Sequence, residues 1–222
     1  MLLAVDTSTR QMGLALYDSA QVVGEFLWHS RHYHTVELAP AVAELLSRSG
    51  LKMDVVQALG VALGPGSFTS LRVGLAFVKG LALARHLPIV GIPTLDIVAA
   101  AQETRDMPLA AVFQAGRGRL ALVWYEADET GWQSKGSPVV TTADDLAESI
   151  HKPTIVCGEL TADERQRLAR KRVNVLLASP SACVRRPAVL AELAWERWQA
   201  GTQDDAASLA PIYLHVGDPI PS

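Results

Sequence analysis

Three groups of residues in this sequence are of types that carry chemistry. The first is the polar run Asp6, Thr7, Ser8 and Thr9, which follows an apolar segment. Hydroxyl groups and turn amides are donors for a phosphate group, and a carboxylate can hold magnesium through water. The run is therefore a candidate phosphate-binding turn. The alternative is an Asx-type turn that only stabilises a hairpin.

The other two groups are histidines and cysteines. His29, His32 and His34 have spacings that bring imidazoles together only in an irregular segment. We interpret them as solvent-facing loop residues and expect no metal site. Cys157 and Cys183 have no histidine and acid assignable to them, so we predict no catalytic residue. Two thiols without a signal peptide favour a reducing compartment and no disulfide.

Composition limits the class of protein. The chain has 222 residues, 49% of them hydrophobic and 19% charged, and a net charge of −3. These values indicate a folded globular chain without a basic cluster dense enough to grip nucleic acid alone. Arg185 and Arg186 are expected on a solvated helix face. Asp6 interrupts the apolar start and charges interrupt residues 71–92, so we expect neither export nor a membrane span, and a cytoplasmic location.

Two similar hairpins organise the chain. Residues 2–5 and 12–17 are strand-like segments around the first polar run, and residues 109–113 and 120–125 repeat this arrangement. Gln114 stands in the second copy where Asp6 stands in the first. Each hairpin is followed by strands that alternate with helices. This pattern predicts a duplicated α/β unit with subdomains at residues 1–106 and 107–222.

A helix over residues 67–84 follows a Gly-Pro-Gly turn and is apolar on nearly all sides. Such a helix must be covered on two sides. One interpretation is an internal helix covered by the protein's own second subdomain. The other, which we favour, is an interface that this helix forms with the helix before it. The predicted interface residues are Leu38, Val42, Leu45, Phe68, Leu71, Arg72, Leu75, Val78, Lys79 and Ala82.

Several segments together resemble the TsaB (YeaZ) family, within the actin/hexokinase/heat-shock-70 superfamily. They are Ala4-Val5-Asp6-Thr7-Ser8-Thr9, His34-Thr35, Gly64-Pro65-Gly66-Ser67-Phe68-Thr69, Leu71-Arg72-Val73-Gly74, Gly91-Ile92-Pro93-Thr94-Leu95 and Pro211-Ile212-Tyr213. The match is dense in the N-terminal half, whereas the second half matches mainly in layout.

The resemblance implies an actin-like, ribonuclease-H-like duplicated α/β fold and a Gcp-like domain. It implies a non-catalytic subunit that activates a TsaD-type enzyme for threonylcarbamoylation of the adenosine beside the anticodon of tRNA. A TsaE-type ATPase would join the assembly, tRNA would be met only through the complex, and the chain alone would form a homodimer. No cofactor is expected in the chain itself, with ATP or ADP at the complex interface left open.

Departures from the family pattern keep an alternative open. The second hairpin carries Gln114, Gly116 and Arg119 where the family usually has Asp-Ala-Arg and a later glutamate. The histidine pair of TsaD-type enzymes is missing from residues 90–96. The alternative function is a free-standing kinase or ATPase of the superfamily, with Asp6 in its phosphate-binding turn.

Overall fold

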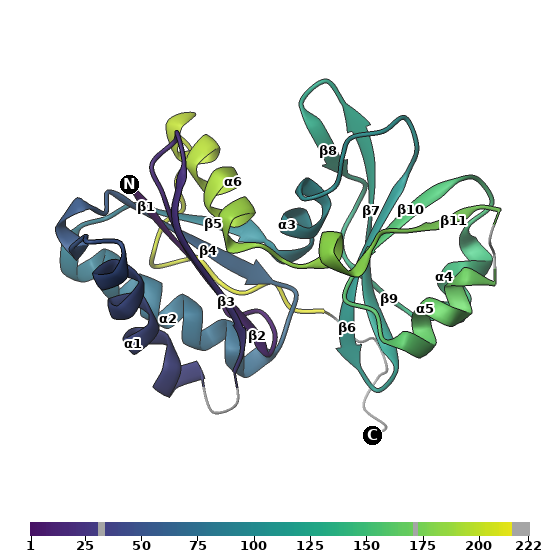
Figure 1. Cartoon of the computed structure of the whole chain (residues 1–222), viewed down its shortest axis with the longest axis horizontal. Helices are drawn as coiled ribbons and strands as arrows, with labels where there is room; N and C mark the ends of the chain where they lie inside the picture. The colour runs from purple at the N-terminus through teal and green to yellow at the C-terminus, as the bar shows by residue number, and fades with distance from the viewer. Residues whose placement is uncertain (31–33, 171–172, 215–222) are drawn as a thin grey trace. The chain divides into compact units, whose positions relative to one another are not determined.

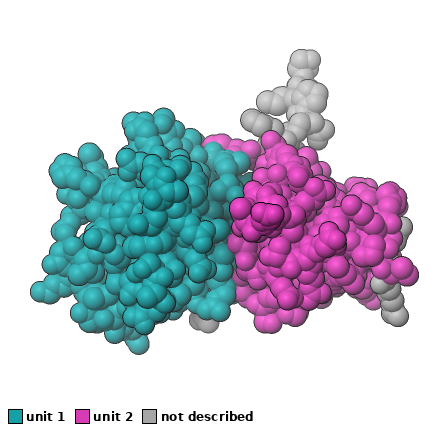
Figure 2. Space-filling model, turned by 90° about the horizontal axis from the view of Figure 1, so that it is seen from above, with its two compact units in different colours: residues 1–97, 185–212 teal, residues 98–184, 213–222 magenta. Residues whose placement is uncertain are grey.

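The computed structural model describes residues 1–30, 34–170 and 173–214 and divides into two compact units. Figure 2 colours them separately. Unit 1 consists of Met1–Ile97 and Arg185–Ile212. Unit 2 consists of Val98–Val184 and the described residues from Tyr213 onward. Each unit is built around its own sheet.

Unit 1 contains a five-stranded sheet in the order β3-β2-β1-β4-β5. Its elements are β1 (Leu2–Asp6), β2 (Gln11–Tyr17), β3 (Val22–His29), α1 (His34–Arg48), the 3₁₀ turn η1 (Met53–Val55), β4 (Ala58–Gly64), α2 (Phe68–Arg85), β5 (Ile89–Pro93) and α6 (Pro187–Gln199). The first three strands are antiparallel, and β4 and β5 continue the sheet in parallel to β1. Helix α3 (Thr94–Ala100) begins in unit 1 and ends in unit 2.

Helices cover both faces of this sheet, as Figure 1 shows. Successive residues of a strand point to opposite faces. Leu3 and Val5 of β1 belong to the core beneath α1 and α2, whereas Leu2 and Ala4 belong to the core beneath α6. At Gly60 of β4 an added Cβ would lie 2.9 Å from the Cβ of Ala194, so the missing side chain lets α6 approach closely.

This packing of α6 corrects the predicted subdomain boundary. Residues 107–222 were expected to form one subdomain, but Arg185–Ile212 returns to unit 1. The reason is the apolar face of α6, whose Leu190, Ala191 and Ala194 are fully buried with the residues of the first sheet.

Unit 2 repeats the topology of unit 1. Its elements are β6 (Leu109–Gly116), β7 (Arg119–Asp128), β8 (Gly131–Ser134), β9 (Val139–Thr141), α4 (Ala143–Ser149), β10 (Thr154–Gly158), α5 (Ala162–Ala169), β11 (Val175–Leu177) and the 3₁₀ turn η2 (Pro180–Cys183). The strand order β11-β10-β6-β7-β8 mirrors the first sheet, with antiparallel β6–β7 and parallel β6–β10–β11. This agreement confirms the predicted duplication.

The sequence missed three short elements of unit 2. Between the end of the second predicted hairpin and β10, the sequence analysis located no element, whereas the structure has β8, β9 and α4 there. Thr142 caps the start of α4, since its side chain accepts a hydrogen bond from the amide of Asp145. The buried side of α4 consists only of Ala143, Leu146 and Ala147. This apolar repeat is too short for its helical periodicity to be recognised in the sequence.

The predicted long helix agrees closely with α2, which packs on α1. Leu71, Leu75 and Val78 of α2 face the sheet and are buried. In the part of the chain that is described, no helix combines the length and the apolar character that crossing a bilayer requires.

Candidate functional site

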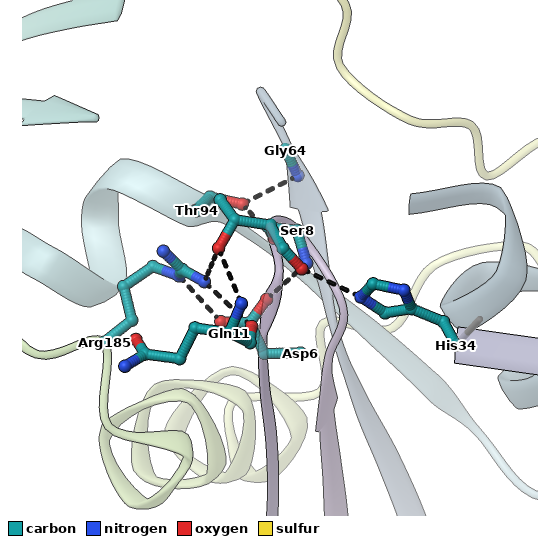
Figure 3. A network of polar contacts seen from close by, with 8 residues as sticks. Asp6, Ser8, Gln11, His34, Gly64, Thr94 and Arg185 are labelled. Atoms are coloured by element: carbon teal, nitrogen blue, oxygen red, sulfur yellow. Dashed lines mark hydrogen bonds and ion pairs between the residues drawn. The ribbon is translucent and has the colours of Figure 1, made fainter. Parts of the chain in front are cut away.

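The candidate phosphate-binding turn, residues 6–9, connects β1 to β2 and is closed by an arginine from the far end of unit 1 (Figure 3). Asp6 is 2% exposed and Arg185 is fully buried. The Nε of Arg185 donates to Oδ2 of Asp6 at 2.9 Å. Its Nη2 donates to Oγ1 of Thr9 at 2.9 Å and to the carbonyl of Gln11 at 3.2 Å. The charge of this carboxylate is therefore compensated inside the protein.

Arg185 corrects the sequence interpretation, which placed it on a solvated helix face. Its neighbour Arg186 is indeed exposed and pairs with Glu25. No local pattern distinguishes the two arginines, because the partner of Arg185 lies 179 positions away. It is the main site residue that sequence reasoning missed.

The serine of the 6–9 turn is bonded within the fold. Its amide donates to Oδ1 of Asp6 at 2.8 Å, the local Asx contact that the alternative interpretation expects. The hydroxyl groups of Ser8 and Thr94 are 2.7 Å apart, and Oγ1 of Thr94 also accepts the amide of Gly64 at 3.0 Å. Ser8 and Thr94 are both fully buried.

The turn is also bonded to the beginning of α2. Oγ1 of Thr7 donates to the carbonyl of Ser70 at 2.8 Å, and the amide of Ser67 donates to the carbonyl of Ser8 at 2.7 Å. A Cβ added at Gly74 would lie 2.2 Å from Oγ1 of Thr7. Close approach of α2 to the turn thus depends on that glycine.

The start of α1 meets the same turn. The imidazole Nε2 of His34 lies 2.9 Å from the carbonyl of Thr9 (Figure 3). Together these contacts make the 6–9 turn a junction that fixes the first turns of α1 and α2 to each other. The geometry thus favours a structural role for Asp6, Thr7, Ser8 and Thr9, each of which is engaged by groups of the protein.

The outer faces of α1 and α2 enclose a groove of about 450 Å³. We call it the α1–α2 groove; its walls are Thr35, Leu38, Ala39, Phe68, Thr69, Arg72, Val73, Ala76 and Phe77. Phe68 is 52% exposed, and the guanidinium carbon of Arg72 lies 3.7 Å from the centre of its ring. Such a contact orients both side chains at the rim.

The structure exposes a different face of α1 and α2 from the one that the predicted interface residues mark. Seven of the ten predicted residues are buried in the core of unit 1: Leu38, Val42, Leu45, Leu71, Leu75, Val78 and Ala82. Of these seven, Leu38 alone also lines the α1–α2 groove. Phe68 and Arg72 are exposed, and Lys79 is half-buried. Because α2 is apolar on nearly all sides, periodicity found its apolar stripes but could not tell which one faces the sheet.

None of the described histidines belongs to a cluster of ligating residues that could hold a metal ion. His29 ends β3 and His34 begins α1, while His32 lies outside the described residues. Within residues 1–30, 34–170 and 173–214, no cluster of three or more histidine, cysteine or acidic side chains has the arrangement that a metal ion needs.

Gln114 of the second hairpin contacts a buried acid of α5 that sequence reasoning missed. Nε2 of Gln114 donates to Oε2 of Glu164 at 2.6 Å and to the carbonyl of Glu159 at 3.3 Å. Oε2 of Glu164 also accepts the amide of Thr161 at 2.7 Å and its hydroxyl at 2.9 Å. Thr161 and Glu164 form the capping box of α5, a sequence signal that could have located this carboxylate.

Both cysteines are buried and free. Burial raises the pKa of the Cys157 thiol far above its usual range, with the neighbouring thiol of Cys183 as a smaller cause. A thiol so strongly disfavoured as thiolate is a poor nucleophile. The structure therefore gives Cys157 a packing role.

Comparison with known proteins gives a family match. The family model described as "TsaD: tRNA N6-adenosine threonylcarbamoyltransferase" matches residues 28–155. The chain is 32% identical over 158 residues to the Escherichia coli (strain K12) protein named tRNA threonylcarbamoyladenosine biosynthesis protein TsaB. This alignment covers 70% of this chain and 64% of that relative. Alignments to TsaB relatives from Bacillus subtilis and Haemophilus influenzae span 55% and 42% of their lengths.

Solved structures give the fold. YeaZ from Pseudomonas aeruginosa superposes with a TM-score of 0.79 at 25% identity, over 96% of this chain and 99% of that one. A ROK hexokinase from Thermus thermophilus superposes with a TM-score of 0.53 at 10% identity, over 89% of this chain and 99% of that one. The second match concerns the fold alone. Both confirm the predicted duplicated α/β, actin-like architecture.

Proposed function

Because the chain belongs to the TsaB (YeaZ) family, we propose that it takes part in the biosynthesis of threonylcarbamoyladenosine in tRNA. In this role it is a non-catalytic subunit that binds a TsaD-type enzyme. Binding activates that enzyme to transfer a threonylcarbamoyl group to the adenosine beside the anticodon. Ordering of the partner's site on binding is a sufficient mechanism, since it shifts a population without adding a reacting group.

The observation that carries the proposal is the apolar surface around the α1–α2 groove. Its apolar walls include Leu38, Phe68, Val73 and Phe77, and Phe68 is 52% exposed. Large apolar side chains gathered on one helical surface mark an interaction site more often than they mark an ordinary surface. A groove between two helices suits an amphipathic helix of a partner.

The non-catalytic part of the proposal is supported by the 6–9 turn and by the second hairpin. The carboxylate of Asp6 is paired with a buried guanidinium, and Gln114 occupies the matching position in unit 2 without an ionisable group. Reaction chemistry, metal and nucleotide would then belong to the partner. A TsaE-type ATPase, ATP or ADP at the complex interface, a homodimer of the free chain and a cytoplasmic location complete the proposed assembly.

The test is a threonylcarbamoylation assay with the cognate TsaD-type enzyme, its carbamoyl-adenylate substrate and tRNA, with and without this chain. We expect activity that depends on stoichiometric addition of the chain and no activity from the chain alone. Activity of the enzyme at full rate without the chain would contradict the proposal. ATP turnover by the chain alone that Asp6→Ala abolishes would instead favour the kinase or ATPase alternative.

A matched pair of variants locates the binding surface. Phe68→Glu places a charge in the α1–α2 groove and should abolish association with the TsaD-type enzyme. Val139→Glu changes a side chain of similar exposure, 50%, in unit 2 and should leave association unchanged. Size-exclusion chromatography of the mixtures separates the two results. Equal association of both variants would place the interface elsewhere.

A further inference from the structure

The turn that joins β6 to β7 has an unusual backbone for its sequence. Gly116 pairs with Arg119, leaving Arg117 and Gly118 at the two central positions. Their φ angles are +54° and +69°, after +79° at Gly116. Two-residue hairpin turns with positive φ at both centres prefer asparagine, aspartate or glycine at the first centre. Arginine is a strained choice there, and a strained residue at a surface position suggests a function.

The two arginines of this 116–119 turn have no carboxylate partner among the described residues. Other arginines of the chain do: Arg105 pairs with Glu103, and Arg167 pairs with Asp144 and Asp163. The buried Nε of Arg119 is the one buried side-chain nitrogen or oxygen of the described residues that lacks a hydrogen-bond partner. Buried polar groups without partners are rare in native structures. The turn therefore carries two guanidinium charges that no carboxylate of the described residues compensates, and Arg117 is exposed to solvent.

The carboxylate of Glu164, which contacts Gln114 of the same hairpin, forms no ion pair with either arginine among the described residues. Glu164 is 7% exposed, and the oxygen that Gln114 contacts also accepts both donors of Thr161. Its contacts thus serve the start of α5.

The exposed residues of the turn point to the chemistry of the ligand. Gly116, Arg117 and Gly118 are exposed and supply no apolar side chain. Protein–protein interfaces have an apolar centre, whereas contacts to a nucleic-acid backbone are made by arginines and by backbone amides. The guanidinium group also matches a phosphate group in a two-pronged contact.

We propose that the 116–119 turn binds phosphate groups of an RNA backbone through Arg117 and Arg119. The inference rests on the proposed function, which makes tRNA the nucleic acid present, and adds a direct contact from this subunit. It departs from the sequence-based expectation that tRNA is bound only through the complex. Contacts of this kind position the RNA and carry no sequence information.

The experiment measures binding of fluorescently labelled tRNA to the full-length chain by anisotropy at several KCl concentrations. Arg117→Asn and Arg119→Gln should each weaken binding by roughly tenfold. Each should also reduce the slope of log affinity against log salt by about 0.7–0.9, the contribution of one phosphate contact. Arg105→Asn removes an equal charge from an ion-paired surface arginine of unit 2 and should change neither quantity.

Thermal unfolding separates a binding role from a structural one. Asparagine accepts the positive φ of position 117, so Arg117→Asn should raise the unfolding midpoint by roughly 2–4 °C while RNA binding weakens. A purely structural arginine would move stability and binding in the same direction. Arg117→Lys keeps the charge and should retain most of the affinity.

Three results would overturn the inference. They are absence of tRNA binding by the wild-type chain, wild-type affinity in the Arg117→Asn/Arg119→Gln double variant, and displacement of tRNA by poly-glutamate as effectively as by unlabelled RNA at equal ionic strength. The last would indicate an acidic protein ligand. Association of each variant with the TsaD-type enzyme, measured without RNA, tests the proposed function independently, so failure of one does not imply failure of the other.

Discussion

At the scale of single residues, the position of Arg185 determines what the 6–9 turn can do. A guanidinium with no exposed surface lies 2.9 Å from the carboxylate of Asp6, so each ion is the other's main compensation. A buried ion pair contributes little more to the stability of the fold than an apolar pair of similar size would. Removing one member, however, leaves an uncompensated buried charge. Both residues are therefore needed for the stability of the fold.

Arg185→Met tests this commitment. The change leaves Asp6 buried without a counter-charge and should lower the free energy of unfolding by about 3–5 kcal/mol, measured by urea denaturation. The control Arg48→Met removes an exposed pair with Glu44 and should cost less than about 1 kcal/mol. Adding Asp6→Asn to Arg185→Met should cost less than the two single changes together. Equal losses for Arg48→Met and Arg185→Met would mean that the buried pair is unimportant.

Cys157 gives a second test at this scale. Burial raises the pKa of its thiol, so the folded protein holds it protonated through the alkaline range in which free cysteines react. Iodoacetamide at pH 8.5 should leave Cys157 unmodified in the native protein and alkylate it in urea, as peptide mass spectrometry can show. Rapid native labelling would contradict the buried environment.

At the scale of elements, the sequence predicted some helices well and failed where tertiary contacts decide. The limits of α2 followed from its apolar pattern after the Gly-Pro-Gly turn. The outward face of α2 did not follow, because Phe68 and Leu71 are equally apolar while only the packing of the sheet buries Leu71. The contact between Asp6 and Arg185 was equally inaccessible, since nothing local to either residue encodes the other.

Substitution by alanine should change the stability of the fold in opposite directions at two glycines of α2. Gly74→Ala would push a Cβ to 2.2 Å from Thr7 Oγ1 and separate the helix from the 6–9 turn, at a cost of about 1–3 kcal/mol. Gly80→Ala meets nothing within 4 Å and should stabilise the helix by roughly 0.5–1 kcal/mol. Chemical denaturation of the two variants measures both signs. A stabilising Gly74→Ala would mean that the turn and α2 are not in close contact.

At the scale of the whole molecule, unit 1 is assembled from both ends of the chain. One face of its sheet is covered by α1 and α2 and the other by α6, which comes about a hundred residues after β5. The sequence divided the chain in the middle because duplicated hairpins mark where each copy starts. They do not reveal that the last helix packs on the first sheet.

Truncation distinguishes the two divisions of the chain. A chain that ends after Val184 lacks α6 and should expose Leu2, Ala4 and their neighbours, giving an aggregating protein without a cooperative unfolding transition. A chain that ends after residue 214 keeps every described element and should unfold at nearly the same temperature as the full chain. Differential scanning calorimetry compares them. A soluble, cooperative chain of residues 1–184 would restore the division at residue 106.

The late arrival of α6 also has a consequence for synthesis on the ribosome. All five strands of the first sheet emerge before unit 2 is made, yet the helix that covers one of its faces is completed only at Gln199. At roughly 5–20 residues per second, that face waits on the order of 5–20 s for its cover. The first half of the chain to be translated is thus the last to finish folding, and the nascent protein is most dependent on chaperones during that interval.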